Sequence, residues 1–307
     1  MQPNYTSKLL PAKAIRHRRF GSSDPVPGHK PTVKEQMPDL QNQREDYLFP
    51  IDQVGISRVR HPVQIESDLK PSSQTSIAEI TLTTSLPQQS KGINMSRLTE
   101  QLELYRQQGG STHLSELCSF TRELAERMEQ ENAEMALTFP WFYERSAPVT
   151  GLSGLNHADV TIKIGYKKGM AYTAEIALQV AVTTLCPCSK EISEYSAHNQ
   201  RGIVSVTAVV DPLALQATDW KVMLLEAAES NASSALHPVL KRPDEKRVTE
   251  QAYENPRFVE DMVRLVAADM YEMEDVQAFT VECRNEESIH RHDAWARIAY
   301  DKRAAHS

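Results

Sequence analysis

The sequence predicts an α+β fold made of two similar halves, each an antiparallel sheet that carries two helices on one face. Two observations support this fold class. Apolar residues alternate with the period of a strand or recur with the period of a helix, in the order strand, strand, helix, helix, strand, strand. The same order of elements occurs twice, over residues 46–168 and 169–307. An internal duplication explains this repetition, which is one of element order and not of residue identity.

The first half begins with two alternating segments, 54–65 and 77–84, which we interpret as paired strands. Two strand-like segments, 133–143 and 159–166, complete it. Between the two pairs lie two stripes of helical spacing, formed by Leu98, Leu102 and Tyr105 and then by Leu114, Leu117, Cys118, Leu124, Ala125 and Met128.

The second half repeats this order with strands predicted at 172–184, 203–210, 277–283 and 294–300. One helix is expected from Trp220 to about Ser234. Another helix follows Asn255-Pro256, which provides an N-cap and a first-turn proline. The apolar stripe of this second helix consists of Val259, Met262, Val263, Val266, Ala267, Met270 and Met273.

The composition excludes several classes of protein. Of the 307 residues, 40% are hydrophobic and 24% charged, which suits one large or two medium globular domains. A net charge of −7 argues against a nucleic-acid coat or a membrane-surface protein. The sequence contains no 18-residue apolar run and no signal-peptide core, and four cysteines are too few for a disulfide framework. We therefore expect a soluble cytoplasmic protein without nucleic-acid or membrane partners.

Residues 1–45 are rich in proline and poor in large apolar side chains, so we predict a disordered tail. The tail contains a small basic cluster, Arg16-His17-Arg18-Arg19. Such a cluster could contact nucleic acid or an acidic partner, but we interpret it as a solvated part of the tail.

Two thiols and an imidazole lie within thirteen residues after the first strand of the second half: Cys186, Cys188 and His198. Thiolate and imidazole are the ligands that borderline divalent metals prefer. A cysteine just past a strand, where a helix could begin, is also placed to be a stabilised thiolate. The segment therefore predicts a metal or nucleophile site, although cysteines near a strand end are often core residues. A disulfide between them is not expected, because a ring through Pro187 would be strained.

Three further segments carry candidate groups. The segment 241–246 is interpreted as a solvated loop, although a carboxylate in it could complete a metal site. Glu260 lies one position off the apolar stripe of its helix, as either a surface acid or a partly buried carboxylate that accepts paired N–H donors. His290 and His292 lie in the loop between the last two strands, where histidines are usually surface residues but can also be catalytic.

Four motifs in order resemble the type IB family of GTP cyclohydrolase I. They are Cys-Pro-Cys-Ser-Lys-Glu-Ile-Ser with Ala-His-Asn-Gln-Arg, then Lys-Arg-Pro-Asp-Glu-Lys, Tyr-Glu-Asn-Pro-Arg-Phe-Val-Glu-Asp and Glu-Ser-Ile-His. The resemblance covers roughly residues 50–301. It implies a bimodular tunnelling fold, two antiparallel four-stranded sheets each with two helices on one face, which agrees with the repeat described above. It also implies a homotetramer with active sites at subunit interfaces.

By position, the resemblance implies that the metal ligands are Cys186, His198 and Glu245, with Cys186 also counted as catalytic. It places the guanine-anchoring carboxylate at Glu260 and a catalytic histidine at His290. Where some members of the family have a further histidine, this chain has Asn94, so no catalytic role is carried over to that position. Cations for the triphosphate are expected among Lys190, Arg201, Lys241, Arg242 and Lys246.

The implied reaction converts GTP and water to 7,8-dihydroneopterin triphosphate and formate, the first step of folate synthesis. A metal with three protein ligands keeps one position open for water and lowers the pKa of that water. Glu260 can accept hydrogen bonds from the guanine N1–H and amine, and a histidine can transfer protons. One sulfur, one imidazole and one carboxylate suit Zn²⁺, and the carboxylate also admits Mn²⁺ or Fe²⁺.

Three alternatives remain open at this point. One is a nitrile reductase of the same fold, in which the cysteine is a covalent nucleophile. Another is a metal-dependent hydrolase or cyclase acting on a different purine nucleotide. The third is a binding protein in which the Cys/His/Glu cluster holds structural zinc in a closed four-ligand site.

Overall fold

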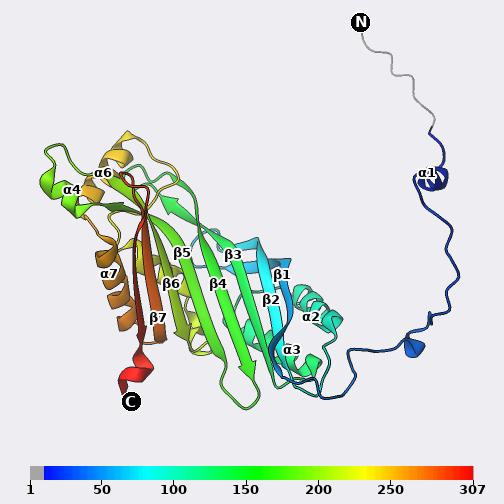
Figure 1. Cartoon of the computed structure of the whole chain (residues 1–307). Coiled ribbons are helices and arrows are strands. Elements are labelled where there is room, and N and C mark those ends of the chain that lie inside the picture. The colour runs from blue at the N-terminus through cyan, green and yellow to red at the C-terminus, as the bar shows by residue number, and fades with distance from the viewer. Residues whose placement is uncertain (1–9, 307) are drawn as a thin grey trace, which may run out of the picture. The chain divides into compact units, whose positions relative to one another are not determined.

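The computed structural model describes residues 10–306 and divides into two units, the residues up to Leu40 and a body from Gln41 onwards. The body is built on one eight-stranded antiparallel sheet in which every strand pairs with its neighbours in the sequence (Figure 1). Its strands are β1 (Ile51–Glu66), β2 (Ser73–Leu86), β3 (Asn132–Ser146), β4 (Ser153–Lys167), β5 (Thr173–Leu185), β6 (Asn199–Val210), β7 (Val276–Glu286) and β8 (Ala294–Asp301).

The sheet confirms the predicted α+β class and the repeated halves, with one difference. The sequence predicts two four-stranded sheets, whereas the structure joins them edge to edge. The last strand of the first half, β4, pairs with the first strand of the second, β5, from Asp159↔Gln179 to Gly165↔Thr173. The joint buries Ile162 opposite Ile176, so both halves share a single apolar core.

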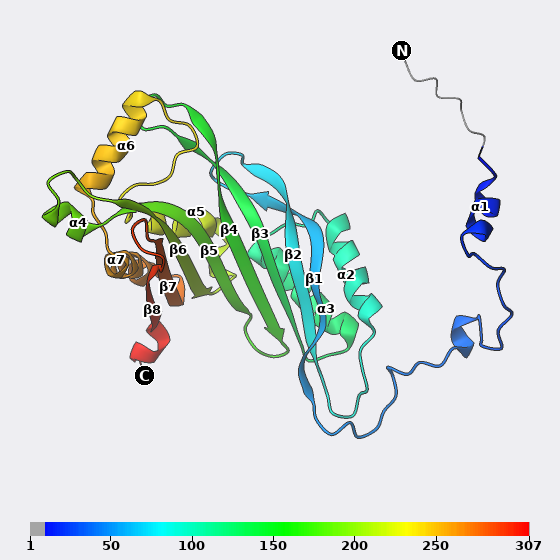
Figure 2. The same cartoon turned by 45° about the horizontal axis from the view of Figure 1, so that its top comes forward.

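Helices cover one face of the sheet and leave the other face without helices (Figure 2). In the first half these are α2 (Met95–Gln107) and α3 (Leu114–Met128), which present the two predicted stripes to the sheet. In the second half α5 (Trp220–Glu229) and α7 (Val259–Glu272) take the equivalent places. Two shorter or more polar helices, α4 (Pro187–Ile192) and α6 (Arg242–Glu254), lie at one end of this half.

The predicted helix boundaries need three corrections. The helix that starts at Trp220 ends at Glu229 and not near Ser234. The helix expected directly after Asn255-Pro256 begins at Val259, because Arg257 first donates its backbone N–H to Leu185 of β5 (3.0 Å). Residues 241–246 are not a loop but the start of α6.

Helix α6 escapes prediction because only Asp244 and Ala252 of its residues are buried, so it has no apolar stripe. Its start is fixed by Asp244, whose buried carboxylate accepts hydrogen bonds from the backbone N–H groups of Lys241 (2.9 Å), Val149 (2.9 Å) and Thr150 (2.8 Å). Burial opposes ionisation of Asp244, but these hydrogen bonds outweigh it and hold the pKa of the carboxyl well below its ordinary value. Asp244 thus attaches α6 to the β3–β4 turn.

Residues 10–40 are exposed throughout and contain a short helix, α1 (Lys13–Arg19), and a 3₁₀ turn at Lys34–Gln36. Between residues 41 and 50 the chain already belongs to the body. Glu45 donates its backbone N–H to Gln89 (3.2 Å), and Gln43 accepts one from Lys91 (3.3 Å). The body therefore includes part of the segment assigned above to the tail. Over residues 10–306, no helix is long and apolar enough to span a membrane.

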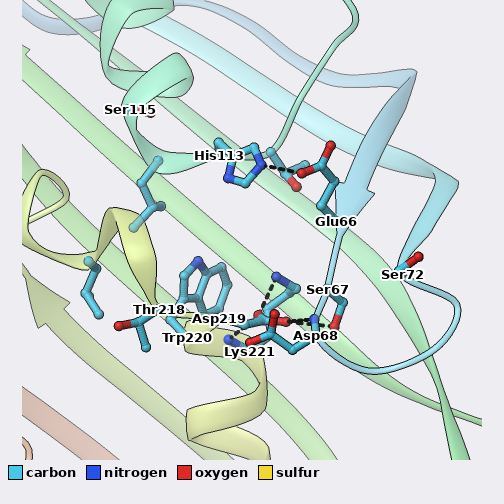
Figure 3. A pocket seen from close by; sticks show the side chains of 13 residues that line it. Glu66, Ser67, Asp68, Ser72, His113, Ser115, Thr218, Asp219, Trp220 and Lys221 are labelled. Atoms are coloured by element: carbon cyan, nitrogen blue, oxygen red, sulfur yellow. Dashed lines mark hydrogen bonds and ion pairs between the residues drawn. The ribbon is translucent and has the colours of Figure 1, made fainter.

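The two halves also meet at the buried carboxylate of Asp219, which lines a pocket of about 310 Å³ (Figure 3). Asp219, the N-cap of α5, lies 2.6 Å from the ammonium of Lys221. The same carboxylate accepts hydrogen bonds from the Ser67 hydroxyl (2.7 Å) and the Asp68 backbone N–H (2.9 Å) in the β1–β2 loop. Asp219 therefore connects a loop of the first half to a helix of the second.

We expect deletion of residues 1–40 to leave the thermal midpoint of the body within about 2 °C of the full chain, because the described part of this segment buries no side chain. Deletion of residues 1–48 is the matched comparison, since it also removes the backbone hydrogen bonds of Gln43 and Glu45. We expect that longer deletion to lower the midpoint measurably in differential scanning fluorimetry. Equal midpoints for the two deletions would contradict the boundary at Gln41.

Asp219→Ala is expected to lower the free energy of unfolding by about 3 kcal/mol or more, because it leaves the buried Lys221 ammonium without its counter-charge. Glu250→Ala, which removes an exposed partner of Lys246, should cost about 0.5 kcal/mol or less. Burial opposes ionisation of Asp219, but Lys221 and the hydrogen bonds lower the net pKa. Its stabilisation is therefore present above the ordinary pKa of 3.8 and is lost as the pH falls through the lower folded-state value. Urea titrations at several pH values measure both effects.

Candidate active site

The candidate site lies at the end of the sheet where β5 finishes and β6 begins. Because these strands pair antiparallel up to Leu185↔Asn199, the chain leaves the sheet at Cys186 and returns to it just after His198. Strand β7 pairs with β6 up to Arg201↔Glu286, so the β7–β8 loop emerges at the same end. These segments and the start of α7 enclose a pocket of about 400 Å³, lined by Cys186, Cys188, Ser189, Ile192, His198, Gln200, Phe258, Val259, Glu260, Asn285, Glu287, Ile289, His290, His292 and Ala294.

Cys186 is held at the pocket by its backbone and by the start of α4. Its N–H donates to the carbonyl of His198 (3.2 Å), which places the two residues side by side. As N-cap of α4, its Sγ accepts from the backbone N–H of Ser189 (3.5 Å). The preceding residue, Leu185, is fixed through both backbone groups. Its N–H donates to the Ser233 hydroxyl (3.0 Å), and its carbonyl accepts from the Arg257 N–H (3.0 Å). The sulfur therefore has a well-defined position at the edge of the pocket.

The burial of the cysteines separates the site thiols from core thiols. All four are free; Cys118 and Cys283 are buried, Cys186 is half-buried and Cys188 is exposed. Burial raises the pKa of Cys118 to about 11 and that of Cys283 to about 12. Those two are core cysteines, whereas the interpretation of Cys186 and Cys188 as core residues is wrong.

His198 lines the pocket, and one of its two ring nitrogens has a hydrogen-bond partner. Its Nδ1 lies 3.2 Å from the Ser288 hydroxyl of the β7–β8 loop, and its backbone N–H donates to the Ser189 hydroxyl (3.3 Å). A hydrogen bond at Nδ1 fixes the orientation of the ring and leaves Nε2 for a ligand or a metal. Sequence reasoning did not identify Ser288, although it lies within the quoted Glu-Ser-Ile-His motif.

Two histidines of the β7–β8 loop complete this side of the pocket. The rings of His290 and His292 are stacked, with centroids 4.9 Å apart and an angle of 13° between their planes. Both side chains are exposed and line the pocket. Of these two histidines, the family resemblance implies a catalytic role for His290 alone, but the structure places His292 beside it.

Glu260 enters the pocket from the start of α7. It is the second residue of that helix, and a carboxylate in the first turn is favoured by the helix dipole. The next residue, Asp261, accepts the backbone N–H of Phe258 (3.0 Å) and fixes the first turn, so the two neighbouring acids have different roles. The carboxylate of Glu260 is exposed and lines the pocket.

The structure does not bring the remaining predicted residues into this pocket. Glu245, Lys241 and Arg242 lie at the exposed start of α6, and Arg201 is exposed on β6. Across residues 10–306, no three His, Cys, Asp or Glu side chains are grouped closely enough to hold a metal ion. Lys190 is engaged elsewhere, because its ammonium donates to the carbonyl of Tyr253 (2.6 Å) and lies 4.2 Å from the centre of its ring.

The comparisons with known proteins agree with this arrangement. A family model described as type I GTP cyclohydrolase folE2 matches residues 37–296. GTP cyclohydrolase FolE2 of Halalkalibacterium halodurans is 59% identical over 297 residues, which are 97% of this chain and 99% of the relative. The corresponding protein of Bacillus subtilis is 55% identical over 294 residues, covering 96% and 97% of the two chains.

This chain belongs to the type I GTP cyclohydrolase FolE2 family. Membership confirms the family that the four motifs resemble, and it favours that hypothesis over a nitrile reductase or a structural zinc protein. Uricase from Arthrobacter globiformis has a similar fold, with a TM-score of 0.50 and 8% identity over 82% of this chain and 93% of uricase. At that identity the likeness concerns the fold alone, and it confirms the predicted tunnelling fold.

Proposed function

We propose that the pocket bounded by Cys186, His198, Glu260 and His290 is where this chain converts GTP and water to 7,8-dihydroneopterin triphosphate and formate. That reaction, the first step of folate synthesis, is the activity of the family. The observation that supports the location is the convergence of a thiol, imidazoles and a carboxylate from four segments on one pocket of about 400 Å³. Such a group of ionisable side chains in a cavity is typical of an active site.

Glu260 is proposed to bind the guanine base. Its carboxylate can accept two hydrogen bonds, from N1–H and from the exocyclic amine, which would fix the orientation of the base in the pocket. Among the purines only guanine offers these two donors side by side. The position of Glu260 in the first turn of α7 supports this role, because it brings the carboxylate to the pocket that the start of the helix lines.

Cys186 and His198 are proposed to hold a divalent metal, on which enzymes of this family depend. The donor atoms fit: Sγ and Nε2 belong to neighbouring residues, and Ser288 orients the ring through Nδ1. When bound, such an ion would supply a water of lowered pKa for attack on C8 of guanine. Zn²⁺, Mn²⁺ and Fe²⁺ all suit sulfur, imidazole and carboxylate donors.

Glu245 remains our proposal for the third metal ligand. It lies in the first turn of α6, whereas the contact of α6 with α4, from Lys190 to the carbonyl of Tyr253, is made by the last turn of α6. Glu245 therefore requires a movement of α6, or a contribution from a second copy of the chain, to join Cys186 and His198 at the metal. A metal titration of Glu245→Gln would decide between Glu245 and Glu260 as ligand.

His290 is proposed to transfer protons as the imidazole ring of guanine opens and formate leaves. An imidazole changes protonation near neutral pH and is suited to both steps. The stacked His292 restricts the orientation of the His290 ring. Both side chains are exposed to the pocket, which gives them access to substrate and water.

The triphosphate site and the assembly are proposed together. Lys190, Arg201, Lys241 and Arg242 are the candidate cations, and these four side chains do not line the pocket. Strands β1 and β8 form the edges of the sheet, and apart from the bridge of Gln64 to Ser111 their outer edges have no partner strand among residues 10–306, which favours pairing with another chain. We therefore propose a homotetramer with sites at subunit interfaces, which acts in the reducing cytoplasm.

Cys186→Ala is expected to abolish GTP turnover and to reduce bound metal, because it removes the sulfur donor while leaving the strand end in place. Turnover is measured by the fluorescence of the oxidised pterin and metal content by elemental analysis. Cys188→Ala is the matched control, since Cys188 is an exposed thiol of the same pocket two residues away. A fully active Cys186→Ala enzyme would refute the proposed metal site.

Glu260→Gln is expected to reduce kcat/KM for GTP by about tenfold or more while metal content and thermal midpoint stay near wild type. The substitution keeps the shape but turns one acceptor oxygen into a donor that faces the guanine donors. Glu272→Gln, an exposed acid at the other end of α7, is the control and should leave turnover unchanged. Loss of metal in Glu260→Gln would instead identify Glu260 as a ligand, and unchanged turnover would make it a surface acid.

A further inference from the structure

The floor of the pocket contains polar side chains at positions that are apolar elsewhere on the same face of the sheet. Along β5, β6 and β7 the residues that face the helices are buried, among them Val182, Val204 and Val281. At the end of the sheet next to the pocket, this face instead carries Thr184 on β5, Gln200 on β6 and Asn285 on β7, which are 0%, 8% and 1% exposed. A row of buried polar groups is costly unless each is hydrogen-bonded.

Two members of this row have no partner for an oxygen atom. Within the described chain, the Thr184 hydroxyl and the Gln200 side-chain carbonyl are both buried and make no hydrogen bond. Asn285 is different, because its carbonyl accepts from the Cys283 thiol (3.6 Å). Orphaned buried polar atoms are rare in proteins and concentrate where a ligand supplies the missing contact.

The two orphaned groups belong to paired residues. Thr184 lies directly opposite Gln200 in the β5–β6 ladder and on the same face, so the side chains are cross-strand neighbours. A hydroxyl donor and a carbonyl acceptor can then pair after a small side-chain rotation. That pairing leaves the amide –NH₂ of Gln200 free to donate to a ligand in the pocket, which Gln200 and Asn285 both line.

We infer that Gln200 is a base-specificity residue, whose amide donates a hydrogen bond to O6 of guanine, and that Thr184 orients it. The inference rests on the proposed function, in which Glu260 accepts from N1–H and the 2-amine. The group next to N1 on the ring is O6, which is an acceptor and needs a donor from the protein. Adenine carries an amine at that position, so a donor there selects against it.

Gly202 allows this row to pack closely. A Cβ at this position on β6 would come within 3.1 Å of the Asn285 carbonyl oxygen and of the Thr184 methyl. Glycine therefore leaves room for the side chains of Thr184 on β5 and Asn285 on β7 to pack over the strand between them.

The main test compares GTP with 6-thio-GTP as substrates of the wild type and of Gln200→Leu. Both enzymes are purified with their metal retained. Gln200→Leu should reduce kcat/KM for GTP by roughly tenfold. It should reduce kcat/KM for 6-thio-GTP, which has a poor acceptor in place of O6, much less. ITP is the control substrate, because it keeps O6 and lacks only the 2-amine. Gln200→Leu should reduce kcat/KM for ITP by the same factor as kcat/KM for GTP. Glu260→Gln, in contrast, should remove the preference for GTP over ITP.

The thermal midpoint is a second readout. If Gln200 had a structural role, its replacement would lower the midpoint. The buried carbonyl of Gln200 makes no hydrogen bond, so replacing the side chain with an apolar one removes an unsatisfied group, and the thermal midpoint of Gln200→Leu should stay the same or rise. Thr184→Val, which removes only the hydroxyl, should lower the ratio of kcat/KM for GTP over 6-thio-GTP, though less than Gln200→Leu. An unchanged ratio in Thr184→Val would overturn its orienting role.

Failure of this inference is distinguishable from failure of the proposed function. If the wild type releases pterin from GTP but Gln200→Leu loses activity equally with GTP and 6-thio-GTP, Gln200 does not contact O6. A drop in thermal midpoint together with equal losses would make it a structural residue. If the wild type forms no pterin from GTP, the proposed function itself is wrong.

Discussion

The antiparallel pairing of β5, β6 and β7 is the constraint on which the site depends. Leu185↔Asn199 and Arg201↔Glu286 end their ladders at the same level of the sheet, so the segments beyond them must meet. The hydrogen bond from the Cys186 N–H to the His198 carbonyl lies directly beyond the last residue pair of the β5–β6 ladder. It holds the thiol and the imidazole next to each other although they are twelve positions apart in the sequence.

The loops that leave these strands are fixed by a second set of hydrogen bonds. Ser189 contacts Cys186 through its N–H and His198 through its hydroxyl, so one residue of α4 bonds to both candidate metal ligands. Ser288 reaches the His198 ring from the β7–β8 loop. Preorganisation of this kind reduces the ordering that substrate or metal binding would otherwise require.

Buried polar groups divide into those that hold the fold and those that face the pocket. Asp219 and Asp244 are buried carboxylates with several hydrogen bonds each, and both connect the first half of the chain to helices of the second. Gln200 is buried with its carbonyl oxygen unpaired. A fully satisfied polar group stabilises a unique packing, as the two aspartates do, whereas an unsatisfied one lowers stability. The proposed role of Gln200 accounts for its different state, because Thr184 can pair with the carbonyl and leave the amide –NH₂ for the substrate.

The sequence by itself determined the element order, the duplication and the identity of the four motifs. Apolar periodicity is a local property, and it gave the stripe of α7 from Val259 to Met270 because that face packs on the sheet. The four motifs proposed Cys186, His198, Glu260 and His290 as site residues through their resemblance to the family, and all four line one pocket.

Only the tertiary structure decided the rest. Helix α6 was missed because its position depends on Asp244 bonding to Thr150, a contact between residues 94 positions apart. The joining of the two sheets depends on the β4–β5 pairing, which no local pattern encodes. The neighbours of Ser288 and Gln200 lie on other segments, since Ser288 contacts the His198 ring and Gln200 lies opposite Thr184. Long-range hydrogen bonds such as these leave no periodic trace in a single sequence, so their partners become visible only in the folded chain.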